Sequence, residues 1–414
     1  MIMKNYKKID SCRVGGGSNL ISVLNLGSQV LTGVFPRSAS EQVTAGPLEL
    51  VWCPESGLLQ LHHSYNLEEM YGNNYGYRSG LNQSMVDHLS SKVAAIEALQ
   101  PLSPGDVVLD IGSNDGTTLR SYQTSGIRRI GIDPTGHKFA DFYPSDVRLV
   151  SDFFSAKAYR AIESKSASVI TSIAMFYDLE SPVDFARQVE SILAPDGIWH
   201  FEQSYLPSML KTNSYDTICH EHLEYYSLHV IKNVLSQSGL RILDVSLNAI
   251  NGGSFAVTAT KTSNKTHHTN QPVIEQLLSQ EEVIGLNTVR PYREFAERVF
   301  KHRDDLVTLV RSLSQSGKKI FGYGASTKGN VLLQFCGFNA DDIQAIVEVN
   351  PEKFGCITPG THIPIISEEA AKAMNPDYYL VLPWHFRSGI LHRELDYISR
   401  GGRFIFPFPK IEVI

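Results

Sequence analysis

Cysteine is scarce in this chain. Its five cysteines are scattered over 414 residues and are odd in number, which argues against a disulfide framework and is typical of a protein from a reducing compartment. Long apolar runs are missing as well, because no stretch approaches the roughly 18 residues of a membrane helix. The first eight residues lack the apolar segment of a signal peptide. We therefore expect a cytoplasmic protein without a membrane partner.

An excess of basic charge is also missing. Lys and Arg number 37 against 43 Asp and Glu, for a net charge of −6, and no basic stripe runs along the chain. This balance argues against nucleic acid as the main partner. At 414 residues the chain is too long for one hydrophobic core, so the length predicts two or three domains, while no pattern in it reports the oligomeric state.

Residues 1–70 predict a small, turn-rich module. Each of two C-x-x-C knuckles has lost its second cysteine, in the runs Cys12-Arg-Val-Gly15 and Cys53-Pro-Glu-Ser56. A tetrahedral zinc site needs four sulfur or imidazole ligands, and only His62 and His63 are present as remote substitutes. We therefore favour a metal-free module with two buried cysteines over a zinc site.

The central part of the chain is organised around residues 107–116, Val-Val-Leu-Asp-Ile-Gly-Ser-Asn-Asp-Gly. Three apolar residues predict a strand buried on both faces. The D-x-G-x-x-x-G spacing then lets the backbone turn tightly and lie close to a ligand, at the crevice where a Rossmann-like sheet binds one. Against the alternative of an ordinary glycine-rich turn, we predict a cofactor site that includes Asp110, Gly112, Asn114 and Gly116.

Acidic residues at the ends of the next two predicted strands indicate the class of ligand. Asp133 ends one strand, where it can accept hydrogen bonds from both ribose hydroxyls. Asp152 follows the next strand, where an adenine amino group would lie. The dinucleotide spacing G-x-G-x-x-G and a pyrophosphate cradle are absent, so we predict S-adenosylmethionine, a nucleoside without phosphates, over a generic nucleotide.

A loop dense in tyrosine and glycine, residues 71–80, precedes this strand and leads into a predicted helix at 81–99. Its phenols either cover a bound ligand or fill a domain seam. Its position favours the lid, with Tyr71, Tyr77 and Ser79 as candidates for contact with the cofactor or substrate.

Strand and helix patterns alternate from residue 104 to about 257, as a doubly wound α/β sheet requires. We predict that this S-adenosylmethionine-binding domain covers residues 71–262. The loop after the fourth strand carries Tyr177, which is aimed at the same crevice.

The run His220-Glu221-His222 is the strongest candidate for catalysis, and Tyr225, three residues later, is a candidate for substrate binding. Imidazoles and carboxylates so close together are costly to bury unless they face a polar cavity. A metal site lacks a third ligand at a familiar spacing, and a purely structural cluster remains the other alternative. We favour general acid–base chemistry, since the pKa of histidine lies near operating pH.

Residues 263–414 predict a helical connector and a second Rossmann-like α/β domain. Strand, glycine turn and helix start recur at residues 318–330, where an anion can bind at the helix N-terminus, although the order of a Walker loop is absent. Cations and aromatics at later strand ends suggest a pocket for a diphosphate and a base, rather than a structural lobe with surface charges. The candidate residues are Lys328, Asn330, Asn350, Lys353, His362, Trp384 and Arg387.

With these residues in view, nearly the whole chain resembles the sugar C-3 methyltransferases that act on nucleotide-linked 4-keto-6-deoxysugars. The motifs that carry the resemblance are D-x-G-S-N-D-G at 110–116, H-E-H-x-x-Y at 220–225, G-x-G-A-x-x-K-G at 322–329 and P-G-T-H-I-P-I at 359–365. The resemblance implies a zinc-knuckle N-terminal module, a central class I methyltransferase domain and a C-terminal domain that holds the sugar nucleotide.

The resemblance also implies roles for single residues. His222 would remove the proton at C-3, with His220 and Glu221 beside it, and Tyr77 would lie against substrate and cofactor. Three departures stand out: Cys219 replaces a tyrosine, a histidine of the fourth-strand loop is replaced near Met175-Phe176, so that Tyr177 fills part of its role, and the knuckles have lost two cysteines.

The expected reaction is methyl transfer through an enolate at C-3, with Tyr77 or His220 stabilising the enolate oxygen. One rival is a nicotinamide-dependent sugar-nucleotide epimerase or dehydratase, but no tyrosine is followed four residues later by lysine. A second rival is a non-catalytic protein on a decayed methyltransferase fold, which the intact His220-Glu221-His222 run disfavours. A third keeps the enzyme class and changes the acceptor to another small molecule.

Overall fold

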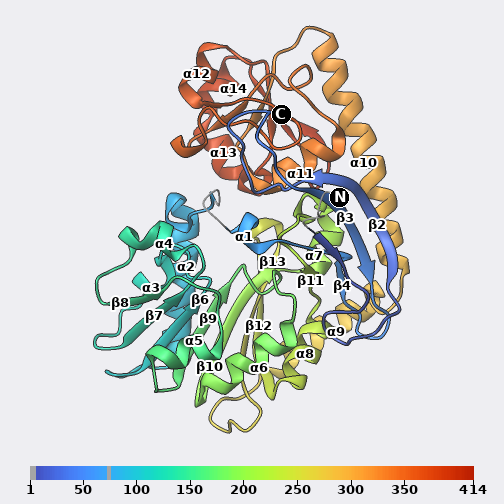
Figure 1. The fold of residues 1–414 in the computed structure, drawn as a ribbon. Coiled ribbons are helices and arrows are strands. Elements are labelled where there is room, and N and C mark those ends of the chain that lie inside the picture. Colours follow the sequence, from blue (N-terminus) through green and yellow to red (C-terminus); the bar gives the residue numbers. More distant parts are fainter. Residues whose placement is uncertain (1–5, 72–75) are drawn as a thin grey trace.

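The computed structural model describes residues 6–71 and 76–414 and shows three domains that meet at a common junction (Figure 1). The central sheet lies below in this view and the C-terminal α/β domain above. The N-terminal strands β2 (Ile21–Val30) and β3 (Ala45–Trp52) run along one side, beside the long helix α10 (Arg290–Gln315).

The N-terminal module is built from short antiparallel strands. Its four-stranded sheet has the order β11-β4-β3-β2, and β1 pairs with β5 separately. The remaining bounds are β1 (Tyr6–Lys8), β4 (Leu59–Leu61), β5 (His63–Tyr65), α1 (Leu67–Met70) and β11 (Glu224–Tyr225). Because β11 comes from the central domain, its pairing with β4 joins the two domains at this sheet edge.

The central sheet has seven strands in the order β12-β13-β10-β9-β6-β7-β8, and β13 is antiparallel to both of its neighbours. Its strands are β6 (Val107–Ile111), β7 (Arg128–Ile132), β8 (Val147–Val150), β9 (Ala167–Ile173), β10 (Leu193–Ser204), β12 (Leu240–Asn248) and β13 (Ser254–Lys261). Every residue of β6 is buried, as its apolar run predicts. The chain order reverses between β6 and β9, and such a switch point is where doubly wound sheets bind ligands.

The central domain also contains helices and short 3₁₀ turns. They are η1 (Ser79–Leu81), α2 (Gln83–Leu99), α3 (Thr117–Arg120), α4 (Gly136–Phe139), η2 (Ala140–Phe142), α5 (Ala156–Ile162), α6 (Pro182–Ile192), α7 (Leu206–Thr212), η3 (Tyr215–Thr217), α8 (Leu228–Gln237) and η4 (Ile250–Gly252). The sequence predicts a helix from residue 81, whereas α2 begins at Gln83. The Asn82 side chain caps it by accepting the N–H of Ser84 at 3.0 Å, which sets the start two residues later.

The C-terminal domain repeats the parallel α/β design. Its six-stranded sheet has the order β16-β15-β14-β17-β18-β19, and only the edge strand β19 is antiparallel. Its elements are β14 (Ile320–Tyr323), α11 (Thr327–Cys336), β15 (Ile346–Glu348), η5 (Pro351–Lys353), β16 (Ile365–Ser367), α12 (Glu368–Ala373), β17 (Tyr378–Val381), η6 (Trp384–Phe386), α13 (Arg387–Arg393), α14 (Leu395–Ser399), β18 (Arg403–Phe406) and β19 (Glu412–Val413).

The predicted connector consists of two helices, α9 (Gln271–Ile284) and α10. Gly285 ends α9 in a left-handed conformation, with φ of 84°. Among the described residues no helix is long and apolar enough to cross a membrane.

Hydrophobic packing makes the domains interdependent. One core contains Leu50 of the N-terminal module, Leu210 of the central domain and Leu333 of α11, and a second core joins Cys12 and Cys53 to the central sheet. The predicted fold class is therefore confirmed: an α/β chain with two Rossmann-like sheets and a small N-terminal module.

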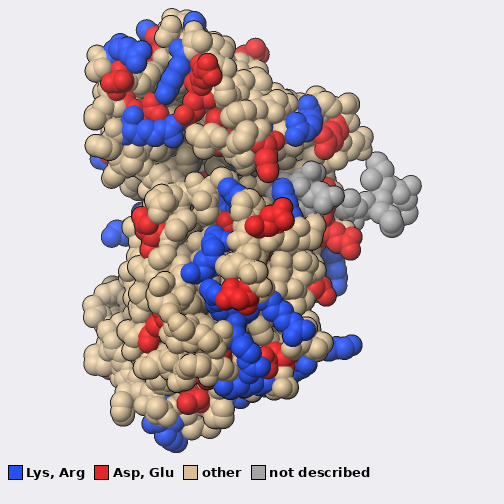
Figure 2. Space-filling view, turned by 90° about the vertical axis from the view of Figure 1, so that its left-hand side faces the viewer, with Lys and Arg blue, Asp and Glu red and all other residues tan. Residues whose placement is uncertain are grey.

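The outer face of the central domain carries many basic side chains (Figure 2). Several are paired with acids, including Arg128 with Glu163 at 2.7 Å and Lys165 with Asp106 at 2.9 Å. The pair of Lys165 and Asp106 is partly exposed and contributes little to folding free energy, whereas the Glu163 side chain is buried.

Candidate active site

The glycine loop after β6 makes the tight turn that its sequence predicts. Gly112, Asn114 and Gly116 all adopt left-handed conformations, with φ of 72°, 51° and 74°. A Cβ on Gly112 would lie 3.1 Å from Cγ of Met175, so glycine is needed for the close approach. Asp110 is buried and accepts the Thr171 hydroxyl at 2.5 Å, and burial raises its pKa to about 7.

Asp133 and the tyrosine loop hold this turn from two sides. The Asp133 carboxylate accepts the backbone N–H of Asn114 at 2.8 Å and that of Thr135 at 2.6 Å. The Asn114 side chain accepts the N–H of Ser79 at 2.9 Å and donates to the carbonyl of Tyr77 at 3.1 Å. The loop that the sequence predicts as a lid is thus bonded to the predicted cofactor loop. Residues 72–75 of this loop lie outside the described residues.

Two further cofactor candidates lie at the rim of the same region. Asp152 is exposed just after β8, where it accepts the N–H of Phe153 at 2.7 Å. Tyr71 donates its hydroxyl to Asp178 at 2.7 Å. Sequence reasoning did not single out Asp178; burial raises its pKa well above the usual range, and one of its carboxylate oxygens is buried without a hydrogen-bond partner.

His222 has a hydrogen-bond partner among the described residues at only one ring nitrogen, Nδ1. Its Nδ1 lies 2.8 Å from the carbonyl of Thr217, so Nδ1 carries the proton and Nε2 keeps its lone pair. The imidazole packs against the Tyr177 ring with centroids 4.2 Å apart, and Tyr225 lines the same cavity. Burial, together with the positive charge of Lys328, lowers the pKa of His222 to about 3, so the ring stays neutral.

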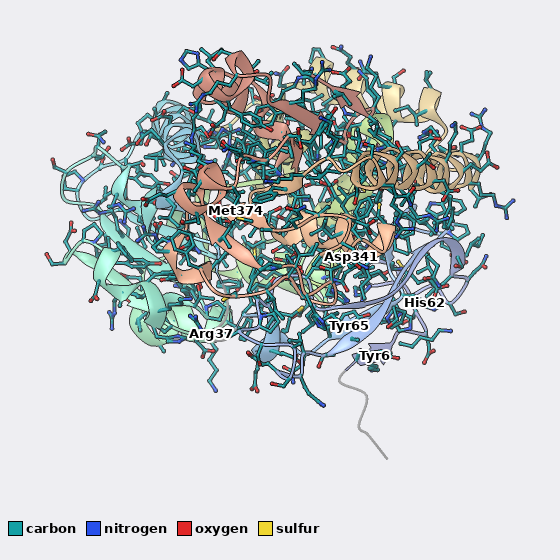
Figure 3. All side chains as sticks on the ribbon, turned by 90° about the horizontal axis from the view of Figure 1, so that it is seen from above. Tyr6, Arg37, His62, Tyr65, Asp341 and Met374 are labelled. Atoms are coloured by element: carbon teal, nitrogen blue, oxygen red, sulfur yellow. The ribbon has the colours of Figure 1, made fainter. Side chains whose placement is uncertain are left out.

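The structure separates His222 from its two predicted partners. His220 is fully buried, edge-on to Tyr65 of the N-terminal module with ring centroids 4.6 Å apart, and burial lowers its pKa to about 4. Tyr65 and Tyr6 lie side by side in that module (Figure 3). Glu221 contacts the position of Gly33, and burial raises its pKa. Three successive side chains therefore point into different surroundings, and only His222 lines the cavity beside Tyr177.

Three residues predicted to bind the sugar nucleotide hold the fold together in the structure. Asn330 is buried and donates to the carbonyl of Thr32 at 2.8 Å; Trp384 donates its indole N–H to Asp216 at 2.8 Å. Arg387 pairs with Glu412 at 2.6 Å. The reason is that buried or crowded polar groups need partners, and the neighbouring domains or strands supply them.

Three of the other candidates in the C-terminal domain take part in hydrogen bonds, and the fourth is exposed. Lys353 donates to the carbonyl of Ala325 at 2.8 Å, and Asn350 accepts the N–H of Glu352 at 3.1 Å. His362 is exposed, with φ of 55°. Lys328 donates to the carbonyl of Asn251 at 3.0 Å, across the boundary between the C-terminal and central domains.

The knuckles of the N-terminal module do not fit zinc. The Cys12 thiol lies 3.1 Å from the Ser56 hydroxyl, and a Cβ on Gly15 would lie 3.5 Å from Cβ of Ser56, so the former ligand positions converge. Two of them carry no sulfur, however, and burial raises the pKa of the Cys53 thiol to about 11, against the thiolate that zinc needs. Among the described residues no group of three or more potential ligands is found.

The predicted substitute ligands are occupied elsewhere. His62 is 3.0 Å from a carboxylate oxygen of Glu49 and lies near the surface of the module (Figure 3). His63 is buried against the ring of Tyr6. Neither is part of a group of potential metal ligands within residues 6–71 and 76–414.

Sequence reasoning also missed polar residues at the domain boundary. Asp216 faces the C-terminal domain through Trp384, and burial raises its pKa to about 6. His385 has a buried Nδ1 without a hydrogen-bond partner, and burial lowers its pKa to about 3. Both residues lie close in sequence to candidate residues, since His385 follows Trp384 and Asp216 precedes the run at 220–222. The sequence could not show which side chains they contact in the fold.

Comparisons with known proteins place the chain in a family. Family models match residues 12–71 ("Putative zinc binding domain"), 86–245 ("Methyltransferase domain") and 249–409 ("C-methyltransferase C-terminal domain"). The chain is 33% identical over 412 residues to C-methyltransferase NovU of Streptomyces niveus, covering 99% of this chain and 97% of that protein.

Solved structures overlap less of the chain. One is a complex of the Haloferax volcanii Trm112 methyltransferase activator with a methyltransferase, at 16% identity and a TM-score of 0.36 over 44% of this chain and 94% of that chain. Another is an S-adenosylmethionine-dependent methyltransferase from Clostridium acetobutylicum, at 14% identity and a TM-score of 0.33 over 42% of this chain and 92% of that chain. The near full-length similarity to NovU, joined to the three family models, shows that the chain belongs to the S-adenosylmethionine-dependent C-methyltransferase family.

Proposed function

We propose that this C-methyltransferase adds a methyl group to C-3 of a nucleoside-diphosphate-linked 4-keto-6-deoxysugar, through an enolate, in branched deoxysugar biosynthesis. The observation that carries the proposal is the state of His222. Its Nδ1–H is held by the Thr217 carbonyl at 2.8 Å, which leaves the Nε2 lone pair free. A proton α to a ketone is acidic enough for a positioned imidazole to remove.

The residues around the glycine loop fit S-adenosylmethionine. One Asp133 oxygen accepts a single N–H from the protein, and a carboxylate oxygen can accept two bonds, so acceptor capacity remains for a ribose hydroxyl. Gly112 and Gly116 let the backbone approach the cofactor, Asp152 faces the adenine end, and the Tyr77 loop covers it. When bound, the cofactor supplies a methyl group on a positively charged sulfur.

The sugar nucleotide is proposed to lie between the central and C-terminal domains. The carboxyl ends of β6, β7 and β8 face the C-terminal domain (Figure 1), and Lys138 of α4 reaches Glu352 of η5 at 3.8 Å. This contact brings η5, with Lys353 in it and Asn350 just before it, near α4 of the central domain. Of the residues expected to bind the nucleotide, these two and His362 remain the candidates in this region.

The proposal is tested with His222→Asn. The enzyme is incubated in deuterated water with S-adenosylmethionine and a panel of thymidine- and guanosine-diphosphate 4-keto-6-deoxyhexoses, and methyl transfer and C-3 exchange are followed by mass spectrometry and NMR. We expect the wild type to methylate at least one sugar at C-3. The variant should be slower by about 10²–10⁴-fold, the contribution of a general base.

The matched control is His268→Asn, because His268 is exposed and lies on the polar segment before α9. It should behave as the wild type. Undiminished exchange and transfer in His222→Asn would remove His222 from the base role, and transfer to oxygen in place of carbon would refute the enolate route.

A further inference from the structure

The first turn of α11 lies where the three domains meet. Helix α11 packs against η3, whose Thr217 carbonyl holds the imidazole of His222 at 2.8 Å. Thr327 and Glu221 both border the position of Gly33 in the N-terminal module. From this turn Lys328 extends into the central domain and donates to the Asn251 carbonyl at 3.0 Å. A cation of the C-terminal domain is thus built into the surroundings of the catalytic histidine.

The ammonium group of Lys328 is incompletely paired. Within residues 6–71 and 76–414, no carboxylate lies in ion-pair distance of it, and the Asn251 carbonyl accepts one of its three N–H groups. The nearby Asp216 uses one oxygen for the Trp384 indole. Burial lowers the pKa of Lys328, and the negative charge of the nearby Asp216 offsets part of this effect. The ammonium therefore keeps N–H groups that can donate to an acceptor arriving with the substrate.

The positive charge of Lys328 affects two histidines, one of which is the proposed base. Burial and the field of Lys328 together lower the pKa of His222 and of His385. A base with so low a pKa is weak, and it can remove a carbon-bound proton only if the resulting anion is stabilised. Of the two side chains expected to stabilise this anion, His220 is packed against Tyr65, and Tyr77 belongs to the loop that is bonded to Asn114.

We infer that Lys328 is a catalytic residue that stabilises the enolate oxygen of the substrate, an inference that rests on the proposed function. The C–H bond breaks and its proton moves to Nε2 of His222, while the electron pair shifts to the ketone oxygen, which the Lys328 ammonium contacts. The carbonyl re-forms as the carbon takes the methyl group and the methyl–sulfur bond breaks. The lysine therefore neutralises charge that exists only along the reaction path.

Kinetics with Lys328→Met separate this role from the anchoring of a diphosphate. If Lys328 stabilises the enolate, kcat falls by about 10²–10³-fold with little change in KM, as for the loss of an oxyanion donor. Lys328→Arg keeps the charge and should recover part of kcat. A rise in KM at unchanged kcat would assign Lys328 to ground-state binding and overturn the inference.

A second measurement needs no substrate. The His222 ring is followed by NMR against pH and is identified by its loss in His222→Asn. We expect its titration midpoint to move upward in Lys328→Met, because a neighbouring positive charge is removed. The control is Lys319→Met, since Lys319 of the same domain also donates to a carbonyl, that of Met374 at 3.1 Å, and should leave the midpoint unmoved.

The two sets of outcomes keep the proposals distinct. Failure of the wild type to methylate any sugar nucleotide of the panel overturns the proposed function. An unmoved His222 titration in Lys328→Met, or a change in KM alone, overturns the role of Lys328.

Discussion

In both Rossmann-like sheets a buried carboxylate accepts a backbone N–H of the glycine turn, but the two turns differ in backbone conformation and in how the following helix is capped. At the end of the second strand in chain order, Asp133 accepts the N–H of Asn114 at 2.8 Å, and in the C-terminal sheet Glu348 accepts the N–H of Ala325 at 2.9 Å. Both carboxylates are buried. A buried acid at this position therefore stabilises the turn whether or not a nucleoside also binds to it.

The difference lies in what closes the turn. The first has left-handed residues at Gly112, Asn114 and Gly116, and helix α3 begins without a side-chain cap. In the second, Gly324 alone is left-handed and Ser326 caps α11 by accepting the N–H of Gly329 at 3.0 Å. In the first turn the carboxylate of Asp115 accepts the N–H of Thr117 at 3.2 Å. The turns therefore differ in the number of left-handed residues and in the side chain that closes the start of the helix.

Substituting valine for a glycine in each turn should give the largest difference between the two turns. Gly112→Val would strain a backbone at φ 72° and press on Met175, so we expect binding of S-adenosylhomocysteine, measured by calorimetry, to weaken about 100-fold. Gly324→Val, with its Cβ 2.9 Å from Pro383, should lower the melting temperature and leave that affinity unchanged. Equal losses of affinity in both variants would mean that the turns do not differ in function.

The buried Asp110, at the end of the strand before the first turn, should make the protein less stable as pH rises towards 7. Burial raises the pKa of Asp110 to about 7, well above the usual range of an aspartate. Its contribution to the free energy of unfolding is therefore fully present below the unfolded pKa and is lost as pH rises through the folded value. Between pH 5 and 7 this costs about 2 kcal/mol. Urea unfolding at both pH values should show a smaller loss in Asp110→Asn, and an equal loss would exclude Asp110 as its source.

Neutralising Asp133 and Glu348 in turn tests whether both carboxylates support cofactor binding. Asp133→Asn removes a charged acceptor from the Asn114 N–H and from a ribose, so affinity for S-adenosylhomocysteine should fall about tenfold. Glu348→Gln removes the same charge from the second turn and should leave the affinity unchanged. A tenfold loss in Glu348→Gln as well would show that the C-terminal turn supports the cofactor site.

Removing the cap of α11 should have the smallest effect. Ser326→Ala leaves the N–H of Gly329 without its acceptor and should cost about 1 kcal/mol of folding free energy, measured by thermal unfolding, with unchanged cofactor affinity. Tighter binding of phosphate in this variant, measured by calorimetry, would show that the serine occupies an anion site. No change in stability would show that the cap is dispensable.

The sequence alone determined the features that depend on neighbouring residues. The buried strand β6, the left-handed glycine turn and the acid at position 133 follow from an apolar run, from φ angles that favour glycine and from strand spacing. The class of fold and of enzyme came with them, through motifs in a fixed order.

Tertiary structure decided which polar side chains face the reaction. Trp384 pairs with Asp216 across 168 residues and Asn330 with Thr32 across 298, so residues predicted to bind substrate also join domains. Likewise His220, Glu221 and His222 diverge because consecutive residues of a turn point in different directions. A buried polar group must find a partner, and only the packed chain shows whether that partner is protein or leaves the group for a substrate.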